Sequence, residues 1–90
     1  AGELADLVLY WPRSESEVTP RLRALRKRIV EVGGIWVISA KRGQARAGRP
    51  YLASEVIALG LAAGLVDNKI CSVSVSDTAM RFVIRRSDRR

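Results

Sequence analysis

Two short apolar runs constrain the fold of this chain more than any other feature. Residues 4–11 read LADLVLYW and residues 35–40 read IWVISA, with a single polar residue in each run. Continuous apolar runs of this length are typical of strands that are buried on both faces of a parallel sheet. Parallel neighbours require a crossover connection, so the segment between the two runs is expected to supply a helix.

That connecting segment has the pattern of an amphipathic helix that ends at Gly33-Gly34. Its apolar residues recur every three or four positions and form one stripe: Val18, Leu22, Leu25, Ile29 and Val32. Two starting points are compatible with this stripe. Ser14 and Glu17 form an S-x-x-E capping box, whereas Thr19 followed by Pro20 offers a later cap with proline at the first helical position.

The second half begins with a basic loop, residues 41–50, which reads KRGQARAGRP. A helix is predicted over residues 52–63, where many side chains are small and Gly60 would let the helix pack closely on a sheet. Residues 69–76 alternate between apolar residues and serines, which predicts a strand, and residues 80–86 predict another. The short turn between these two strands implies an antiparallel hairpin.

These elements predict one hydrophobic core. We expect it to contain residues from every helix and strand: Leu7, Leu9, Leu22, Leu25, Ile29, Ile35, Val37, Ile57, Leu61, Ile70, Val73, Phe82 and Ile84. Cys71 falls on the apolar side of the alternating strand, where we expect a small core residue. Gly64 is expected just after the second helix, and Asp67 and Asn68 are expected to form a turn.

The resulting order is strand, helix, strand, helix, strand, strand. It resembles the second half of a class I, S-adenosylmethionine-dependent methyltransferase, in which the last strand inserts antiparallel into the sheet. The resemblance implies a half-Rossmann α/β domain over residues 1–90, as a single domain or as the second half of a longer one. The sheet order would be 4–11, 35–40, 80–86 and 69–76, with 80–86 antiparallel.

The segments themselves resemble an uncharacterised bacterial family that has the same second half. The resemblance is carried by ADLVL at residues 5–9, GIWV at 34–37, GLVDNKICSV at 64–73 and MRFVIRR at 80–86. Members of that family are longer, which implies that this chain lacks the half that would hold the cofactor. The sequence also has no G-x-G-x-x-G pattern, so we expect no bound cofactor.

Composition removes several classes of function. The chain has no histidine and a single cysteine, so it offers no imidazole base, no internal disulfide and no zinc-binding CxxC motif. No apolar run approaches the ~18 residues that span a membrane. No signal peptide is evident. We therefore expect a cytoplasmic protein without a membrane segment and without a catalytic centre.

The net charge of +7 favours an acidic partner such as nucleic acid. The positive charge gathers in three segments, residues 13–28, 41–49 and 81–90. Most of these bases are arginines, and arginine suits bidentate contacts with phosphate. A high content of arginine also follows from a high-GC genome, and in that case it implies no partner.

Ligands of open α/β sheets gather outside the carboxyl ends of the parallel strands. Trp11 and the pair Lys41-Arg42 stand at these ends and would form an aromatic and cationic pocket for an anion. The residues predicted to bind an anion or nucleic acid are Lys41, Arg42, Arg46, Arg49, Trp11, Arg23 and Lys27. The alternative is a solvated turn beside a partly buried tryptophan.

The strand at residues 4–11 would lie at the edge of the sheet, and a long apolar edge strand is normally paired or covered. We therefore expect a homodimer formed through this strand, or a missing segment that pairs with it. Three functions remain open. The chain is a non-catalytic binding or self-assembly module, a basic nucleic-acid-binding domain, or a fragment of a methyltransferase.

Overall fold

Residues 29–40 and 77–84 are rich in β-branched and aromatic residues, which favour extended backbone, and both form strands. The computed structural model describes residues 4–52 and 55–85. Within these residues the elements are β1 (Ala5–Tyr10), the 3₁₀ turn η1 (Glu15–Glu17), α1 (Val18–Arg26), β2 (Ile29–Ala40), α2 (Glu55–Ala62), β3 (Leu65–Ser72) and β4 (Asp77–Ile84).

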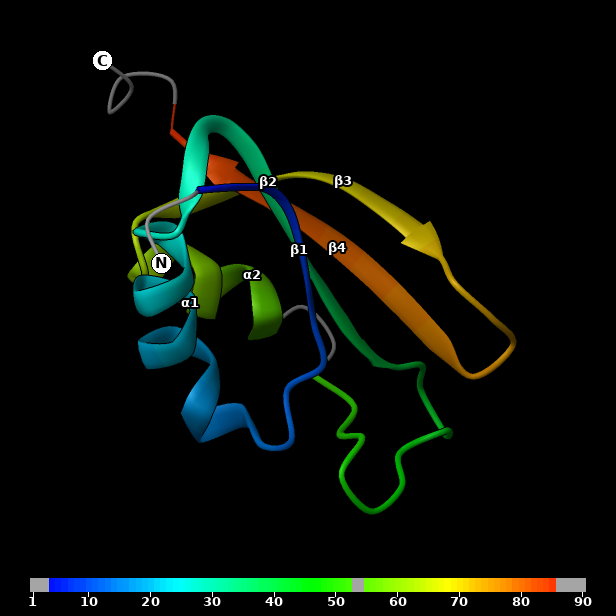
Figure 1. Ribbon diagram of the computed structural model, residues 1–90. Coiled ribbons are helices and arrows are strands. Elements are labelled where there is room, and N and C mark those ends of the chain that lie inside the picture. The colour runs from blue at the N-terminus through cyan, green and yellow to red at the C-terminus, as the bar shows by residue number, and fades with distance from the viewer. Residues whose placement is uncertain (1–3, 53–54, 86–90) are drawn as a thin grey trace.

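The sheet has the order β1-β2-β4-β3, so β4 lies between β2 and β3 although it follows both in the chain (Figure 1). β1 and β2 are parallel, whereas β4 is antiparallel to both of its neighbours. The register places Leu9 beside Trp36, and Trp36 beside Arg81. The predicted strand order and the antiparallel insertion of the last strand are therefore confirmed.

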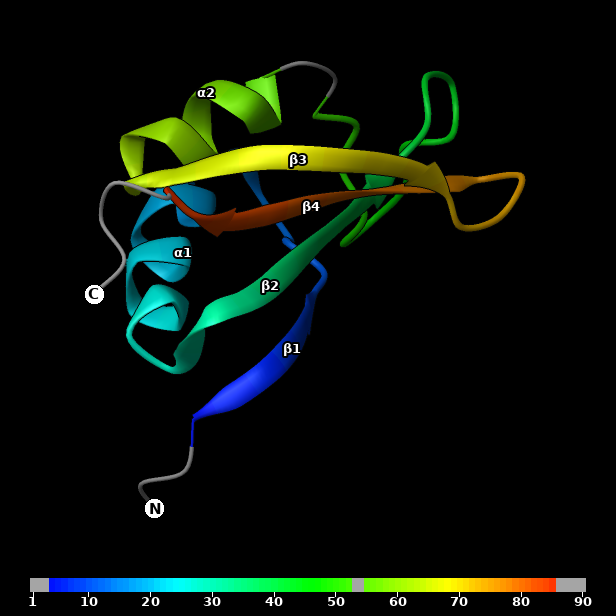
Figure 2. The same cartoon turned by 90° about the horizontal axis from the view of Figure 1, so that it is seen from above.

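Both helices pack on the same face of the sheet, so the described residues form two layers (Figure 1 and Figure 2). The core between the layers is apolar, and its most deeply buried members are Val18, Leu22, Ile35, Val37, Leu52, Leu65 and Phe82. The two helices are also joined directly, because the Thr19 hydroxyl donates to the Leu59 carbonyl at 2.9 Å. The opposite face of the sheet has no helix over it within the described ranges.

α2 lies close to the sheet because Gly60 has no side chain. A Cβ atom at Gly60 would run into the ring of Phe82, which is fully buried on β4. Gly64 follows the helix with a φ of 85°, in the left-handed region that glycine adopts without strain. The predicted roles of both glycines are confirmed.

The helix predicted in the first half is too long, because its last residues belong to a strand. α1 ends at Arg26 and β2 begins at Ile29. Ile29, Val30 and Val32 are β-branched, and such residues favour extended backbone. Ile29 is buried in the core, whereas Val32 is 68% exposed, so the predicted apolar stripe does not continue to Val32.

The hairpin also begins earlier than predicted. β3 starts at Leu65 and includes Asp67 and Asn68, which do not form the expected turn. A bulge between Asp67 and Lys69 accommodates them inside the strand. β4 starts at Asp77, so the turn lies at residues 73–76. Residues 53–54 of the second predicted helix, residue 86 of the last predicted strand and the rest of the basic tail lie outside the described residues.

Part of the predicted core is confirmed, since six of its members are buried: Leu22, Ile29, Ile35, Val37, Phe82 and Ile84. Leu25 and Ile57 pack against the core from its margin. The prediction is wrong for a third group, whose members are exposed: Leu7, Leu9, Leu61, Ile70, Val73 and Cys71. Leu7 and Leu9 lie on the face without helices, and Val73 lies beyond the end of β3.

Candidate functional site

β1 is an edge strand of the sheet, and β2 is its only neighbour in the described part of the chain. Leu7 and Leu9 alternate with Val8 and Tyr10, so the leucines face away from the helices. Leu7 is 56% exposed, Leu9 52% and Trp11 42%. The prediction that this strand is buried on both faces is therefore wrong, because the described helices cover one face alone.

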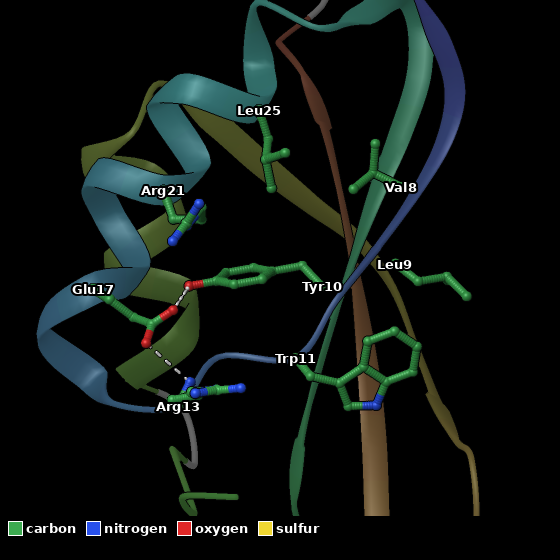
Figure 3. Close-up of a pocket in the computed structure, with 8 residues that line it drawn as sticks. All are labelled: Val8, Leu9, Tyr10, Trp11, Arg13, Glu17, Arg21 and Leu25. Atoms are coloured by element: carbon green, nitrogen blue, oxygen red, sulfur yellow. Dashed lines mark hydrogen bonds between the residues drawn. The ribbon is translucent and has the colours of Figure 1, made fainter. Parts of the chain in front are cut away.

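We use the term apolar edge face for the side chains of Leu7, Leu9, Trp11 and Trp36. Figure 3 shows Leu9 and Trp11 on the side of β1 opposite to Tyr10. Trp36 continues this surface on β2, because it is the register neighbour of Leu9. Leu7 and Leu9 lie on the edge strand and Trp11 directly follows it, so the surface reaches the open border of the sheet.

On the helix side of β1, Tyr10 and Glu17 line a cavity of about 450 Å³. The Tyr10 hydroxyl donates to Glu17 Oε2 at 2.7 Å, and the Arg13 backbone N–H donates to Oε1 at 3.1 Å (Figure 3). Burial, followed by the hydrogen bond to Glu17, raises the pKa of Tyr10. The hydrogen bond from Tyr10 lowers the pKa of the Glu17 carboxyl group.

Both oxygens of Glu17 accept hydrogen bonds, so the carboxylate links the end of β1 to the turn before α1. The capping box predicted from Ser14 and Glu17 does not form, because Ser14 makes no side-chain capping hydrogen bond. Glu17 instead bonds to Tyr10 and to the residue before Ser14. This tyrosine partner depends on how β1 packs beside η1, which the sequence pattern does not reveal.

A second cavity, of about 280 Å³, lies at the carboxyl end of β2, where Lys41, Arg42 and Tyr51 line it. Arg42 Nε donates to the Tyr51 hydroxyl at 3.4 Å, and the guanidinium carbon lies 6.0 Å from the centre of the tyrosine ring. The contact with Tyr51 raises the pKa of Arg42. Lys41 Nζ donates to Ser72 Oγ at 2.6 Å, which ties the loop to β3.

Of the residues predicted to bind an anion, the structure brings Lys41 and Arg42 together at this cavity. Arg46 lies on the same loop but donates to both carboxylate oxygens of Asp77, at 3.1 and 3.2 Å. Arg49 forms backbone hydrogen bonds with Arg46 and does not line the cavity. The sequence therefore points to this loop but does not show which of its bases line the cavity.

The other predicted residues lie elsewhere. Trp11 belongs to the apolar edge face, and Tyr51 is the aromatic residue that stands beside Arg42. Arg23 donates to the Ala62 carbonyl at 3.2 Å and so gives a hydrogen-bond partner to the last carbonyl of α2. Lys27 directly follows the last residue of α1, and it does not line the cavity. The one signal for Tyr51 in the sequence is its position directly after the basic loop.

The described residues contain no group of three or more side chains that would hold a metal ion. None of the helices in that part of the chain is long and apolar enough to cross a membrane. The two features with a defined chemical character are the apolar edge face and the cavity beside Arg42. Neither a family model nor a curated protein matches the chain.

Proposed function

We propose that this chain is a non-catalytic self-assembly module, in which a second copy pairs with the open edge of β1. The observation that carries the proposal is the apolar edge face, on which Leu7, Leu9 and Trp11 are each at least 42% exposed. An exposed apolar edge strand is a template for pairing with another chain. Pairing would satisfy the open backbone groups and remove apolar area from water.

The direction of the backbone groups supports pairing of β1 with itself. The Ala5 N–H donates to the Arg28 carbonyl at 2.8 Å, on the side of β2. Backbone groups alternate in direction along a strand, so those of Val8 are expected at the open edge. An antiparallel pair centred on Val8 would place Leu7 of one copy opposite Leu9 of the other, on the same face.

Charge also favours a second copy over an acidic partner at this edge. Residues 4–12 contain no lysine or arginine and one acid, Asp6, although the whole chain carries +7. An acidic partner would therefore find no opposite charge on β1. A second copy would bring apolar side chains against apolar side chains and would leave the basic loop at residues 41–49 outside the contact.

Light scattering coupled to size-exclusion chromatography tests the proposal. We expect the wild-type chain to be a dimer. Leu9→Lys removes one leucine per copy from the contact, each worth about 1.5–3 kcal/mol, and should raise the Kd of the dimer about a hundredfold or more. Leu61→Lys is the matched control, because Leu61 is 45% exposed on α2 and makes no contribution to the apolar edge face.

Two results would overturn the proposal. One is a wild-type chain that stays monomeric throughout the micromolar range, which would also fit the alternative that a further segment of a methyltransferase-like chain pairs with β1. The other is a dimer that Leu9→Lys leaves intact, since its interface would then lie elsewhere.

A basic nucleic-acid-binding domain is the second candidate. The loop at residues 41–49 carries four bases without an acid and extends past the end of the sheet (Figure 1). Asp77 engages Arg46, which leaves the other three bases for phosphate contacts. The two candidates differ in their response to salt. Salt should weaken the binding of nucleic acid, whereas it should leave the apolar contact between two copies in place.

A further inference from the structure

The cavity at the carboxyl end of β2 shares no lining residue with the apolar edge face. We propose that this cavity binds a small aromatic carboxylate, with the ring beside Tyr51 and the carboxylate group at Arg42 and Lys41. Its location is the one at which open α/β sheets generally take ligands, because it lies where a parallel strand ends and a loop follows. The proposal does not depend on whether the chain forms a dimer.

The floor of the cavity is apolar and suits a ring. It is lined by Ala40, Val56, Ile70 and Met80. Ile70 and Met80 are register neighbours on β3 and β4, and Ile70 remains 63% exposed. A flat ring would cover this surface, and it would gain contacts with the methionine sulfur and with the aromatic wall that Tyr51 provides.

Ser39 adds a buried polar group to the same cavity. The residue is 5% exposed, and its side chain lines the cavity. Thr78, its register neighbour, donates to the Cys71 carbonyl at 3.0 Å. The Ser39 hydroxyl can donate a hydrogen bond to an acceptor oxygen of a ligand that enters the cavity. Ser39 and Lys41 are two positions apart in the chain, so both can face the cavity that they line.

The positive charge stands at the rim of the cavity. The hydrogen bond to Tyr51 uses the Nε–H of Arg42 and leaves its two terminal nitrogens for a ligand. These nitrogens form the fork that pairs with both oxygens of a carboxylate. The acid of the neighbouring hairpin, Asp77, forms an ion pair with Arg46 at 3.1 Å. Its charge is therefore balanced and opposes an incoming anion less.

The size of the cavity limits the ligand. Its volume of about 280 Å³ lies just below the range for small-molecule sites, which is roughly 300–1,000 Å³. This space accommodates one ring with a short acidic substituent and excludes a dinucleotide. Arg42, Tyr51 and Ser39 together thus select a ligand by charge, by ring shape and by an acceptor oxygen.

A titration of the ¹⁵N-labelled protein with benzoate, followed by two-dimensional NMR, tests this site. We expect saturable shifts of the amide signals of residues 39–42 and 78–80, without shifts along β1. Acetate carries the charge without the ring, and benzyl alcohol carries the ring without the charge. Each should bind at least about tenfold more weakly than benzoate, because each loses one of the two kinds of contact.

Two variants with the same change of charge make the test specific. Arg42→Gln should weaken benzoate binding about tenfold, since it removes the carboxylate fork. Arg49→Gln changes the same loop outside the cavity and should leave the Kd unchanged. The NMR spectrum of each variant reports directly whether it is folded. Equal weakening by the two variants, shifts that never saturate, or acetate binding as tightly as benzoate would each overturn the proposal.

Discussion

Individual residues of the candidate sites differ in how far the sequence reveals them. Lys41 and Arg42 were predictable, because they follow a strand whose end could be recognised from its apolar run. Ser39 lies inside that run, and nothing in the pattern shows that it lines a cavity. Tyr51 was missed because the path of the preceding loop decides which cavity it lines. Sequence patterns locate chain segments, whereas packing determines which side chains meet.

The hydrogen bond between Tyr10 and Glu17 should make stability depend on pH in the acid range. The pKa of Glu17 is lowered from 4.5 in the folded protein, so its contribution is present above that pH and is lost as the pH falls through the folded value. Glu17→Gln cannot titrate there. We expect its melting temperature to fall less steeply than that of the wild type below pH 4.5.

The Asp77 carboxyl group also has a lowered pKa, through its hydrogen bond from Arg46, so Glu17→Gln should reduce the acid dependence without removing it. Thermal melts recorded by circular dichroism from neutral to acid pH measure how steeply the melting temperature of each protein falls. Tyr10→Phe is the second variant, because it keeps the carboxyl group and its bond from the Arg13 N–H but removes the hydroxyl that donates to Oε2. Parallel curves for the wild type and Glu17→Gln would show that the hydrogen bond does not lower the pKa.

At the scale of elements, strand order was easier to predict than the boundaries of helices and strands. The order follows from the two apolar runs and the hairpin, which leave few topologies. The boundary between α1 and β2 was misplaced, because Ile29 continues the helical stripe of apolar residues and yet belongs to a strand. Its partner Ala5 lies on β1, so a long-range pairing decides the conformation that local spacing leaves ambiguous.

The contact between α2 and β4 gives a prediction at this scale. Gly60→Ala would normally favour a helix by about 1 kcal/mol. Here the new methyl group would run into Phe82, whose ring is fully buried and has little room to move. We expect a net loss of about 1–3 kcal/mol in the free energy of unfolding, measured by urea denaturation.

A double-mutant comparison identifies the cause of that loss. In the background of Phe82→Leu, which removes the ring, Gly60→Ala should cost clearly less than in the wild type. The same cost in both backgrounds would mean that the clash with Phe82 is not its origin.

For the whole molecule, the two-layer fold and the net charge have opposite effects on association between copies. The layer of helices buries one face of the sheet and leaves Leu7, Leu9 and Trp11 exposed on the other, which favours association. Each copy also carries a net charge of +7, which opposes association through long-range repulsion. Only the second effect is screened by salt.

Salt should therefore strengthen the proposed dimer. We expect its Kd to fall severalfold as sodium chloride rises from about 0.02 to about 0.3 M, since the Debye length shortens over this range while apolar contacts persist. Sedimentation velocity measures this Kd. Binding of a labelled oligonucleotide through the loop at residues 41–49 should weaken over the same range, on the order of a hundredfold or more for three phosphate contacts. A dimer that dissociates as salt rises would show that ion pairs hold the copies together, and the apolar edge face would then not be the interface.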